Sequence, residues 1–228
     1  MPGSDWTAVD AVVCDIDGVV VLGNQPIAGV GTALNRLHQA GIELLFVTNN
    51  STKTRATIAK RVSEIVGSSI PVANVVNSGW ATGCFVGGQT DRVYVVGTEG
   101  LRDTLREAGV ETTDDWREAD AVIVGLDFHV TFSALRDASL AVQHGAKFYA
   151  TNADPSYPTG EGQYPGAGAL VAAVATTTGR EPIVCGKPFE PMQRLLKGRG
   201  GRVPLMVGDR PETDIALGKA MGWTTALV

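Results

Sequence analysis

The sequence predicts an α/β protein built on a parallel β-sheet, because short β-rich runs alternate with stretches of helical periodicity along the chain. Several of the apolar runs end in polar residues, which places chemically active side chains at strand ends. The 228 residues are enough for one large domain or two modest ones with a sizeable core.

The expected strands are short runs of apolar and β-branched residues. They cover 11–14, 43–47, 72–76, 93–96, 121–124, 147–150, 183–185, 203–207 and 224–228. Between the first two runs, apolar residues recur at helical spacing from Ile27 to Leu37, and Gly41 follows as a C-cap. The same spacing indicates later helices at Ile58, Val62 and Ile65, at Leu101 and Leu105, at Leu135 and Val142, and from about Glu212 to Met221.

Residues 154–168 form the most irregular stretch, with three prolines and four glycines. A loop of this length and composition is expected there, and it serves either a functional role or a surface connection.

The composition is that of an ordinary globular protein, with 44% hydrophobic and 19% charged residues. The net charge of −5 gives no electrostatic reason to expect nucleic acid or a membrane as a partner. No run approaches the ~18 apolar residues of a membrane span, and the N-terminal residues show no secretory signal. The three cysteines, Cys14, Cys84 and Cys185, lie far apart, so we expect small buried thiols in a reducing cytoplasm.

Two carboxylates directly follow the first expected strand, at Asp15 and Asp17. Ligands of open α/β sheets bind at the carboxyl ends of the strands, so both side chains are expected to face such a crevice. Mg²⁺ would neutralise them, since it prefers oxygen ligands. A calcium loop is excluded because Val19 and Pro26 stand where that loop needs oxygen ligands. Taken alone, the pattern also suits a plain strand-to-loop turn, because Asp and Gly are ordinary turn residues.

A phosphate cradle is indicated after the second strand, where Thr48 is followed by Asn49 and Asn50. A hydroxyl and successive backbone N–H groups at a strand end can hold phosphate oxygens. The alternative is a helix N-cap, a role that Ser51 or Thr52 would serve well.

Lys187 and two further carboxylates follow later strands. Lys187 lies between Gly186 and Pro188 on a constrained turn, where it could pair with both a nucleophile and a phosphate. The surroundings do not match a Walker loop, and the alternative is a solvated surface lysine. Asp209 ends an apolar strand and Asp214 lies five positions later at a helix start, where the alternative role is stabilisation of the helix dipole.

Four motifs together resemble those of the haloacid dehalogenase superfamily. They are Asp15-Ile-Asp17-Gly18, Thr48-Asn49-Asn50, Gly186-Lys187-Pro188 and Gly208-Asp209-Arg210-Pro-Glu-Thr213-Asp214. The similarity continues through 150–158, 165–168 and 178–182. Within the superfamily, the motifs resemble more specifically those of the type IIA phosphatases. That group includes pyridoxal phosphate, phosphoglycolate, p-nitrophenyl phosphate and nucleotide phosphatases.

The resemblance implies a Rossmann-like parallel-sheet core with an α/β cap of the C2a type inserted between the second and third motifs. The 139 positions between Thr48 and Lys187 agree with such an insertion. The core is therefore expected at 1–76 and 182–228, and the cap at 77–181. Members of the family usually continue beyond the position of Val228 for another strand and helix, so either one edge of the core is bare or the chain has been shortened.

The resemblance also implies a Mg²⁺-dependent phosphomonoester hydrolase. Asp15 would attack phosphorus to form an aspartyl phosphate, Asp17 would act as general acid and base, and Lys187 would neutralise the phosphoryl oxygens. The implied metal ligands are the Asp15 side chain, the Asp17 backbone carbonyl and the Asp209 side chain, with Asp214 in support. The phosphate would be held by Thr48 and by the backbone of Asn49 and Asn50.

The implied substrate is a small phosphorylated metabolite, such as a sugar phosphate, glycerol phosphate, phosphoglycolate or a nucleotide. Tyr157 stands where pyridoxal phosphatases of this family carry a substrate-contacting histidine, so we expect it to contact the substrate. Asn152 and Asp154 would shape its loop, and the Tyr for His exchange argues mildly against pyridoxal phosphate. Cap-mediated homodimers occur in the group, and the sequence leaves the oligomeric state open.

Other functions use similar residues. A phosphomutase or other phosphotransferase usually carries a helical cap between the first two motifs, but only 33 positions separate Asp15 from Thr48. A phospho-acceptor signalling domain needs about half this length and lacks an acid two residues after its nucleophile. A catalytically weak phosphate-binding protein on the same fold is disfavoured by the intact set of Asp15, Asp17, Lys187 and Asp209.

Overall fold

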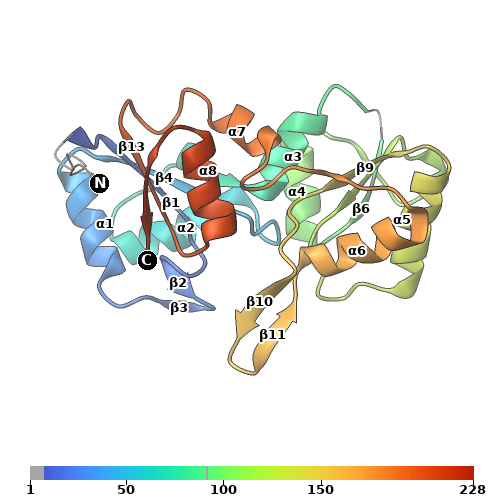
Figure 1. Cartoon of the computed structure of the whole chain (residues 1–228), viewed down its shortest axis with the longest axis horizontal. Coiled ribbons are helices and arrows are strands. Elements are labelled where there is room, and N and C mark those ends of the chain that lie inside the picture. Colours follow the sequence, from blue (N-terminus) through green and yellow to red (C-terminus); the bar gives the residue numbers. More distant parts are fainter. Residues whose placement is uncertain (1–7, 91) are drawn as a thin grey trace. The chain divides into compact units, whose positions relative to one another are not determined.

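The computed structural model describes residues 8–90 and 92–228, which form two compact units (Figure 1). The first unit holds the described residues up to Thr48 together with 55–76 and 193–228. The second unit holds 49–54 and 77–192. The segment 182–192, which the sequence analysis assigns to the core, thus lies in the second unit. The division into core and cap stays a prediction.

A five-stranded sheet forms the centre of the first unit, in the order β14-β13-β1-β4-β5. These strands are β1 (Ala11–Cys14), β4 (Glu43–Thr48), β5 (Val75–Asn77), β13 (Pro204–Gly208) and β14 (Thr224–Leu227). β1 pairs in parallel with β4 on one side and with β13 on the other, so that Cys14 lies level with Phe46 and Val207. The strand order reverses at β1, and ligands bind at such a switch point, beyond the carboxyl ends of the strands.

Most expected strands of this sheet are confirmed, but the third begins later than 72–76. Val72–Asn74 form a 3₁₀ turn after Pro71, and only then does β5 start. The Asn74 side chain donates to the Leu44 carbonyl at 2.9 Å and so ties this turn to β4. A short hairpin of β2 (Val21–Leu22) and β3 (Gln25–Pro26) also belongs to the first unit.

Helices pack on the sheet of the first unit as their apolar spacing predicts. α1 (Val30–Gln39) and α2 (Arg55–Val66) place Leu34 and Val62 against Val12, Leu44 and Phe46 of the strands. The final helical segment is a π-helical turn (Pro211–Ile215) followed by α8 (Ala216–Ala220), which packs against β13.

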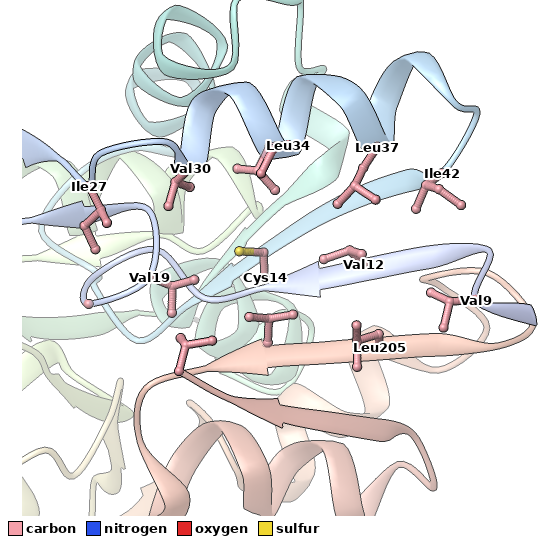
Figure 2. A pocket seen from close by; sticks show the side chains of 14 residues that line it. Val9, Val12, Cys14, Val19, Ile27, Val30, Leu34, Leu37, Ile42 and Leu205 are labelled. Atoms are coloured by element: carbon pink, nitrogen blue, oxygen red, sulfur yellow. The ribbon is translucent and has the colours of Figure 1, made fainter. Parts of the chain in front are cut away.

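An apolar pocket of about 620 Å³ lies along the strands of the first unit, beneath α1 (Figure 2). Val12 and Cys14 of β1 face Leu34 and Leu37 of α1 across it. Its lining offers no charged side chain, so this pocket is not suited to a phosphate group. The chemistry expected from the sequence lies instead at the strand ends.

A second parallel sheet forms the centre of the second unit, in the order β12-β9-β8-β6-β7. Its strands are β6 (Val93–Val96), β7 (Thr112–Thr113), β8 (Ala121–Val124), β9 (Lys147–Ala150) and β12 (Ile183–Val184). Side chains alternate between its two faces, as pleating requires. One face packs on α3 (Ser78–Val86) and α4 (Glu99–Glu107), and the other on α5 (Phe132–Gln143) and α6 (Ala167–Thr178).

The expected loop at 154–168 is wrong in part, because it contains an antiparallel hairpin. β10 (Ser156–Thr159) pairs with β11 (Gly162–Pro165), and α6 begins directly after them. Prolines are tolerated here because both strands of a two-stranded ribbon are edge strands, where a backbone N–H is not always needed. The 3₁₀ turn Trp116–Glu118 and the helix α7 (Glu190–Leu196) complete the described elements.

In the part of the chain that the structure describes, no helix combines the length and the apolar character needed to cross a membrane. The N-terminal residues that show no secretory signal lie outside the described residues. None of the three cysteines, which all lie among the described residues, forms a disulfide. Cys14 and Cys185 are buried as expected, whereas Cys84 is exposed.

Burial raises the pKa of the Cys185 thiol to about 12. Because this value lies above the ordinary 9.0, the unfolded chain ionises first, and the contribution of this thiol to stability falls as the pH rises from about 9 toward 12. Since the thiolate is the reactive form, Cys185 should resist Ellman's reagent in the native protein at about pH 8, while Cys84 reacts. The Cys84→Ser variant should lose the fast phase. A fast phase that peptide mapping assigns to Cys185 would contradict this burial.

Candidate active site

Asp15 and Asp209 leave two neighbouring parallel strands at the switch point of the first sheet. Asp15 follows β1, is only 5% exposed, and its backbone N–H donates to the Val207 carbonyl at 2.9 Å. Asp209 follows β13 directly. Both carboxylates therefore lie at the same edge of the sheet because parallel pairing brings the carboxyl ends of β1 and β13 together.

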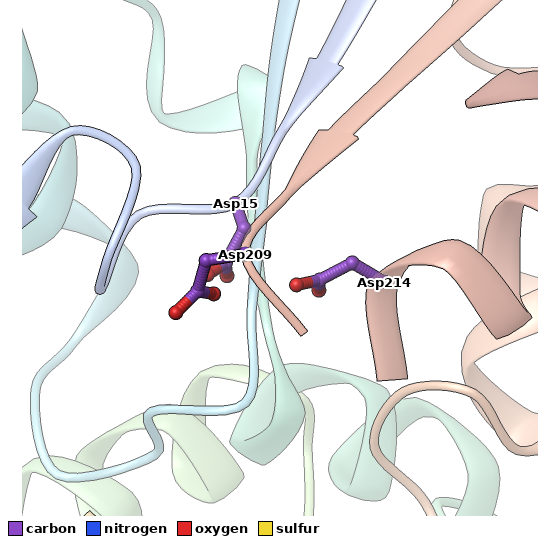
Figure 3. A group of neighbouring side chains, drawn as sticks. All are labelled: Asp15, Asp209 and Asp214. Atoms are coloured by element: carbon purple, nitrogen blue, oxygen red, sulfur yellow. The ribbon is translucent and has the colours of Figure 1, made fainter. Parts of the chain in front are cut away.

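Asp214 joins these two carboxylates from the π-helical turn after β13 (Figure 3). Its carboxylate accepts the Arg210 N–H at 3.1 Å, and its own N–H donates to the Arg210 carbonyl at 3.0 Å. One ligand oxygen from each of Asp15, Asp209 and Asp214 lies within 4.8 Å of the others, and Asp214 is fully buried. Such a set of carboxylate oxygens fits a hard divalent cation such as Mg²⁺, which would remove their mutual repulsion.

The turn after β1 brings Gly18 against Asp209. Gly18 has φ of +97°, and a Cβ at this position would lie 2.2 Å from Asp209 Oδ2. Its N–H donates to the Val21 carbonyl at 2.7 Å, which closes the turn. A residue with a side chain would therefore be strained and would displace the carboxylate, which explains the glycine of the Asp-Ile-Asp-Gly motif.

Asp17 is exposed and interacts with the end of β4. The Thr48 hydroxyl donates to Asp17 Oδ2 at 3.4 Å. The two residues are 31 positions apart in the sequence, and the pairing of β1 with β4 brings them together. Asp17 thus has a polar neighbour at the same strand ends that carry Asp15.

Asn49, Asn50 and Lys187 belong to the second unit. Lys187 is 2% exposed, so the alternative of a solvated surface lysine is wrong. Asn49 is buried and contacts the Lys187 backbone through its side chain. The Asn50 carboxamide oxygen accepts bonds from the Thr52 N–H and hydroxyl, at 3.0 and 2.6 Å, and so shapes the turn that follows Thr48.

Tyr157 lies in the hairpin of the second unit, half-buried between two other aromatic rings. Its ring centroid is 6.4 Å from that of Phe128 and 6.0 Å from that of Tyr164, both edge to face. Nearby, the Asp154 N–H donates to the Asn152 side chain at 3.1 Å, which fixes the start of the loop. Sequence reasoning did not find Phe128, because it lies 29 positions before Tyr157 and no pattern in the sequence connects the two rings.

The structure thus distributes the predicted site residues between the two units. The first unit brings together Asp15, Asp209 and Asp214, with Asp17 and Thr48 paired beside them. The second unit holds Asn49, Asn50, Tyr157 and Lys187. A carboxylate group at the switch point of a parallel α/β sheet is the arrangement of a metal-dependent α/β enzyme.

Comparison with known proteins leads to the same class. The model of the haloacid dehalogenase-like hydrolase family matches residues 12–111, and a second model of HAD-hydrolase-like proteins matches 184–228. The chain is 38% identical to the acid sugar phosphatase of Staphylococcus aureus over 94% of this chain and 84% of that protein. It is 36% identical to the D-glycerol 3-phosphate phosphatase of Mycobacterium tuberculosis over 96% of this chain, but it spans only 62% of that protein.

Solved structures show the same fold. The p-nitrophenyl phosphatase from Archaeoglobus fulgidus superposes with a TM-score of 0.89 at 33% identity, over 96% of this chain and 85% of that chain. The magnesium complex of glycerol phosphate phosphatase from Mycobacterium tuberculosis gives a TM-score of 0.86 at 35% identity, over 97% of this chain and 68% of that chain. The chain belongs to the haloacid dehalogenase-like hydrolases, and its neighbours place it among the type IIA phosphatases.

The Asp214→Asn variant should weaken Mg²⁺ binding by ~10- to 100-fold, because it removes one charge from the carboxylate group. The same change should raise the melting temperature of the metal-free protein, because it relieves repulsion among buried anions. Calorimetric titration with Mg²⁺ and thermal unfolding in a chelator measure the two effects.

Asp114→Asn provides the matched control, since the Asp114 side chain is 96% exposed. It should change neither property. Unaltered Mg²⁺ affinity in a folded Asp214→Asn protein would rule out Asp214 as part of the metal site.

Proposed function

We propose that the chain hydrolyses phosphate monoesters of small metabolites with Mg²⁺, through an aspartyl-phosphate intermediate. One observation carries this proposal: Asp15, Asp209 and Asp214 converge within 4.8 Å at the switch point of the first sheet. The kinship with sugar, glycerol and p-nitrophenyl phosphatases supports the choice of phosphate monoesters.

Asp15 is the nucleophile. One carboxylate oxygen attacks phosphorus, the bond between phosphorus and the leaving oxygen breaks, and the phosphoryl group is carried by Asp15. A water molecule then attacks phosphorus, inorganic phosphate leaves, and the Asp15 carboxylate is restored. Asp15 is suited to this role because it is buried at the end of a rigid central strand, where its position is fixed.

Asp17 is the general acid and base. It gives a proton to the leaving alkoxide in the first step and takes one from the attacking water in the second. Its exposure supports this role, because protons can exchange with solvent between turnovers. The hydroxyl of Thr48, 3.4 Å from Asp17 Oδ2, holds the carboxylate at the strand ends.

Positive charge completes the site. The side chains of Asp15 and Asp209 and the backbone carbonyl of Asp17 would hold Mg²⁺, with Asp214 in support, and the bound cation would withdraw charge from the phosphoryl oxygens. Lys187 adds a second positive charge toward the phosphoryl group, and Thr48 with the backbone N–H groups of Asn49 and Asn50 binds its oxygens. These last assignments rest on the motifs of the family.

The leaving group is chosen by the second unit, through Tyr157. The edge-to-face contacts of Tyr157 with Phe128 and Tyr164 support this role, because these two aromatic rings hold the Tyr157 ring in one orientation. Sugar phosphates and glycerol phosphate are the first substrates to test, in view of the relatives. A reducing cytoplasm suits the three free thiols, and homodimers through the cap are proposed on the family resemblance.

The Asp15→Asn variant should lose at least ~10³-fold in kcat with p-nitrophenyl phosphate and Mg²⁺, because the nucleophile is gone. Asp17→Asn should lose ~10²- to 10⁴-fold. Since p-nitrophenolate leaves without protonation, Asp17→Asn should also accumulate the phosphoryl adduct on Asp15, which peptide mass spectrometry detects. Hydrolysis that survives in Asp15→Asn, or that needs no divalent cation, would overturn the proposal.

The Tyr157→Ala variant should lower kcat/KM for p-nitrophenyl phosphate by about tenfold, because one wall for the leaving group is lost. Acetyl phosphate has a small leaving group and should be affected less. Phe132→Ala is the control, since Phe132 is 84% exposed and belongs to none of the ring contacts of Tyr157. Equal losses for both substrates would argue against contact between Tyr157 and the leaving group.

A further inference from the structure

The side chain of Asn49 forms two hydrogen bonds with the backbone of Lys187. The Lys187 N–H donates to Asn49 Oδ1 at 2.7 Å, and Asn49 Nδ2 donates to the Lys187 carbonyl at 3.3 Å. Asn49 is 8% exposed and Lys187 is 2% exposed, so water competes little for either bond. The carboxamide therefore binds both polar groups of the Lys187 main chain.

The orientation of this carboxamide is set by a third partner. Asn49 Nδ2 also lies 3.3 and 3.4 Å from the two carboxylate oxygens of Asp154. A rotated carboxamide would point its oxygen at the Lys187 carbonyl and at the Asp154 carboxylate, and its NH₂ group at the Lys187 N–H. All three contacts would then be repulsive, so only the observed orientation satisfies them.

The main chain of Asn49 is held as firmly as its side chain. Its carbonyl accepts two hydrogen bonds, from Asn152 Nδ2 at 2.8 Å and from the Ser78 hydroxyl at 2.6 Å. Asn152 follows β9, and Ser78 is the first residue of α3, so two elements of the second unit fix this residue. Asn49 is thus a rigid base for its carboxamide.

Gly186 permits the close approach between Asn49 and the turn that carries Lys187. A Cβ on Gly186 would lie 2.5 Å from Asn49 Oδ1 and 2.6 Å from the Thr151 carbonyl. No larger residue fits without moving the carboxamide or the end of β9. The glycine of the Gly-Lys-Pro motif is explained by the Asn49 side chain.

We infer that the Asn49 side chain is a positioning residue for Lys187, distinct from the phosphate contact expected of its backbone. The inference rests on the proposed function, in which Lys187 carries positive charge to the phosphoryl group. By fixing the main chain of Lys187 on both sides, Asn49 restricts where the ammonium group can be placed. Misplacement of such a group by ~1 Å can cost about 10²-fold in rate.

The required chemistry is specific to asparagine. Aspartate has the same shape and can accept the Lys187 N–H, but it cannot donate to the Lys187 carbonyl, and it sets a second anion beside Asp154. Alanine removes every contact of the side chain and keeps those of the Asn49 main chain. The two substitutions therefore separate loss of the donor from loss of the whole side chain.

Asn77 provides a matched control. It is fully buried in the same unit, its Oδ1 accepts the Trp80 N–H at 2.8 Å, and its Nδ2 donates to the Lys53 carbonyl at 2.9 Å. Asn77→Asp thus makes the same chemical change, with the same kinds of bond lost and kept. It should destabilise the protein in the same way without altering kcat.

The first measurement is kcat and KM for p-nitrophenyl phosphate. We expect Asn49→Asp to lower kcat by ~10- to 100-fold, and Asn77→Asp to leave it near the original value. In a Lys187→Met background, Asn49→Asp should lower kcat by no more than about twofold further. The reason is that an effect exerted through the Lys187 ammonium group is already absent in Lys187→Met. Full, multiplicative losses in the double variant, or an equal loss of kcat in Asn77→Asp, would overturn the inference.

The second measurement is hydrogen exchange at the Lys187 amide, which needs no turnover. Asn49→Ala should speed this exchange by at least ~10-fold beyond any change in global stability, while Asn77→Asp should not. If the Lys187 amide exchanges at an unchanged rate in Asn49→Ala, the Asn49 side chain does not hold the Lys187 main chain. If the unsubstituted protein has no hydrolase activity, only the proposed function is refuted. The exchange measurement would still decide whether Asn49 fixes the Lys187 main chain.

Discussion

The repulsion among Asp15, Asp209 and Asp214 is the constraint around which the first unit is arranged. Three ligand oxygens within 4.8 Å, two of them from buried residues, cannot all be anionic at low cost without a cation. The fold holds them there by rigid means: the parallel strands β1 and β13, which pair with each other, and a π-helical turn whose N-cap residue Arg210 donates its N–H to the Asp214 carboxylate. In the proposed function, stability is given up here for a preorganised cation site, which is a common exchange at functional sites.

The peptide bond between Thr48 and Asn49 joins the two units at the functional residues themselves. Thr48 is the last residue of β4 and bonds to Asp17 within the first unit. Asn49 bonds to Lys187 and Asp154 within the second. The Thr48-Asn49-Asn50 motif thus contributes residues to both units.

The sequence predicted those features that follow from period and polarity. The strands around Asp15, Thr48 and Asp209 could be located because buried parallel strands are continuous apolar runs that end abruptly in polar residues. The helices α3 and α6 were missed because small residues such as Gly, Ala and Thr fill them and give no clear polar stripe. The hairpin β10–β11 was hidden by its prolines, which suggest a loop unless the edge position of both strands is known.

The hydrogen bonds between the Asn49 side chain and the Lys187 main chain could not be predicted from the sequence, for a different reason. Asn49 and Lys187 are 138 positions apart, and no periodic pattern connects a carboxamide with the main chain it will bind. In the motif, Asn49 looked like one more backbone donor for phosphate, and its side chain had no assigned partner. Only the packing of Asn49 against Gly186 and Asp154 reveals that the carboxamide is committed to the second unit. Hydrogen bonds between side chains and the main chain matter for a site as much as its charged groups do. A charged side chain serves catalysis only where the main chain that carries it is fixed.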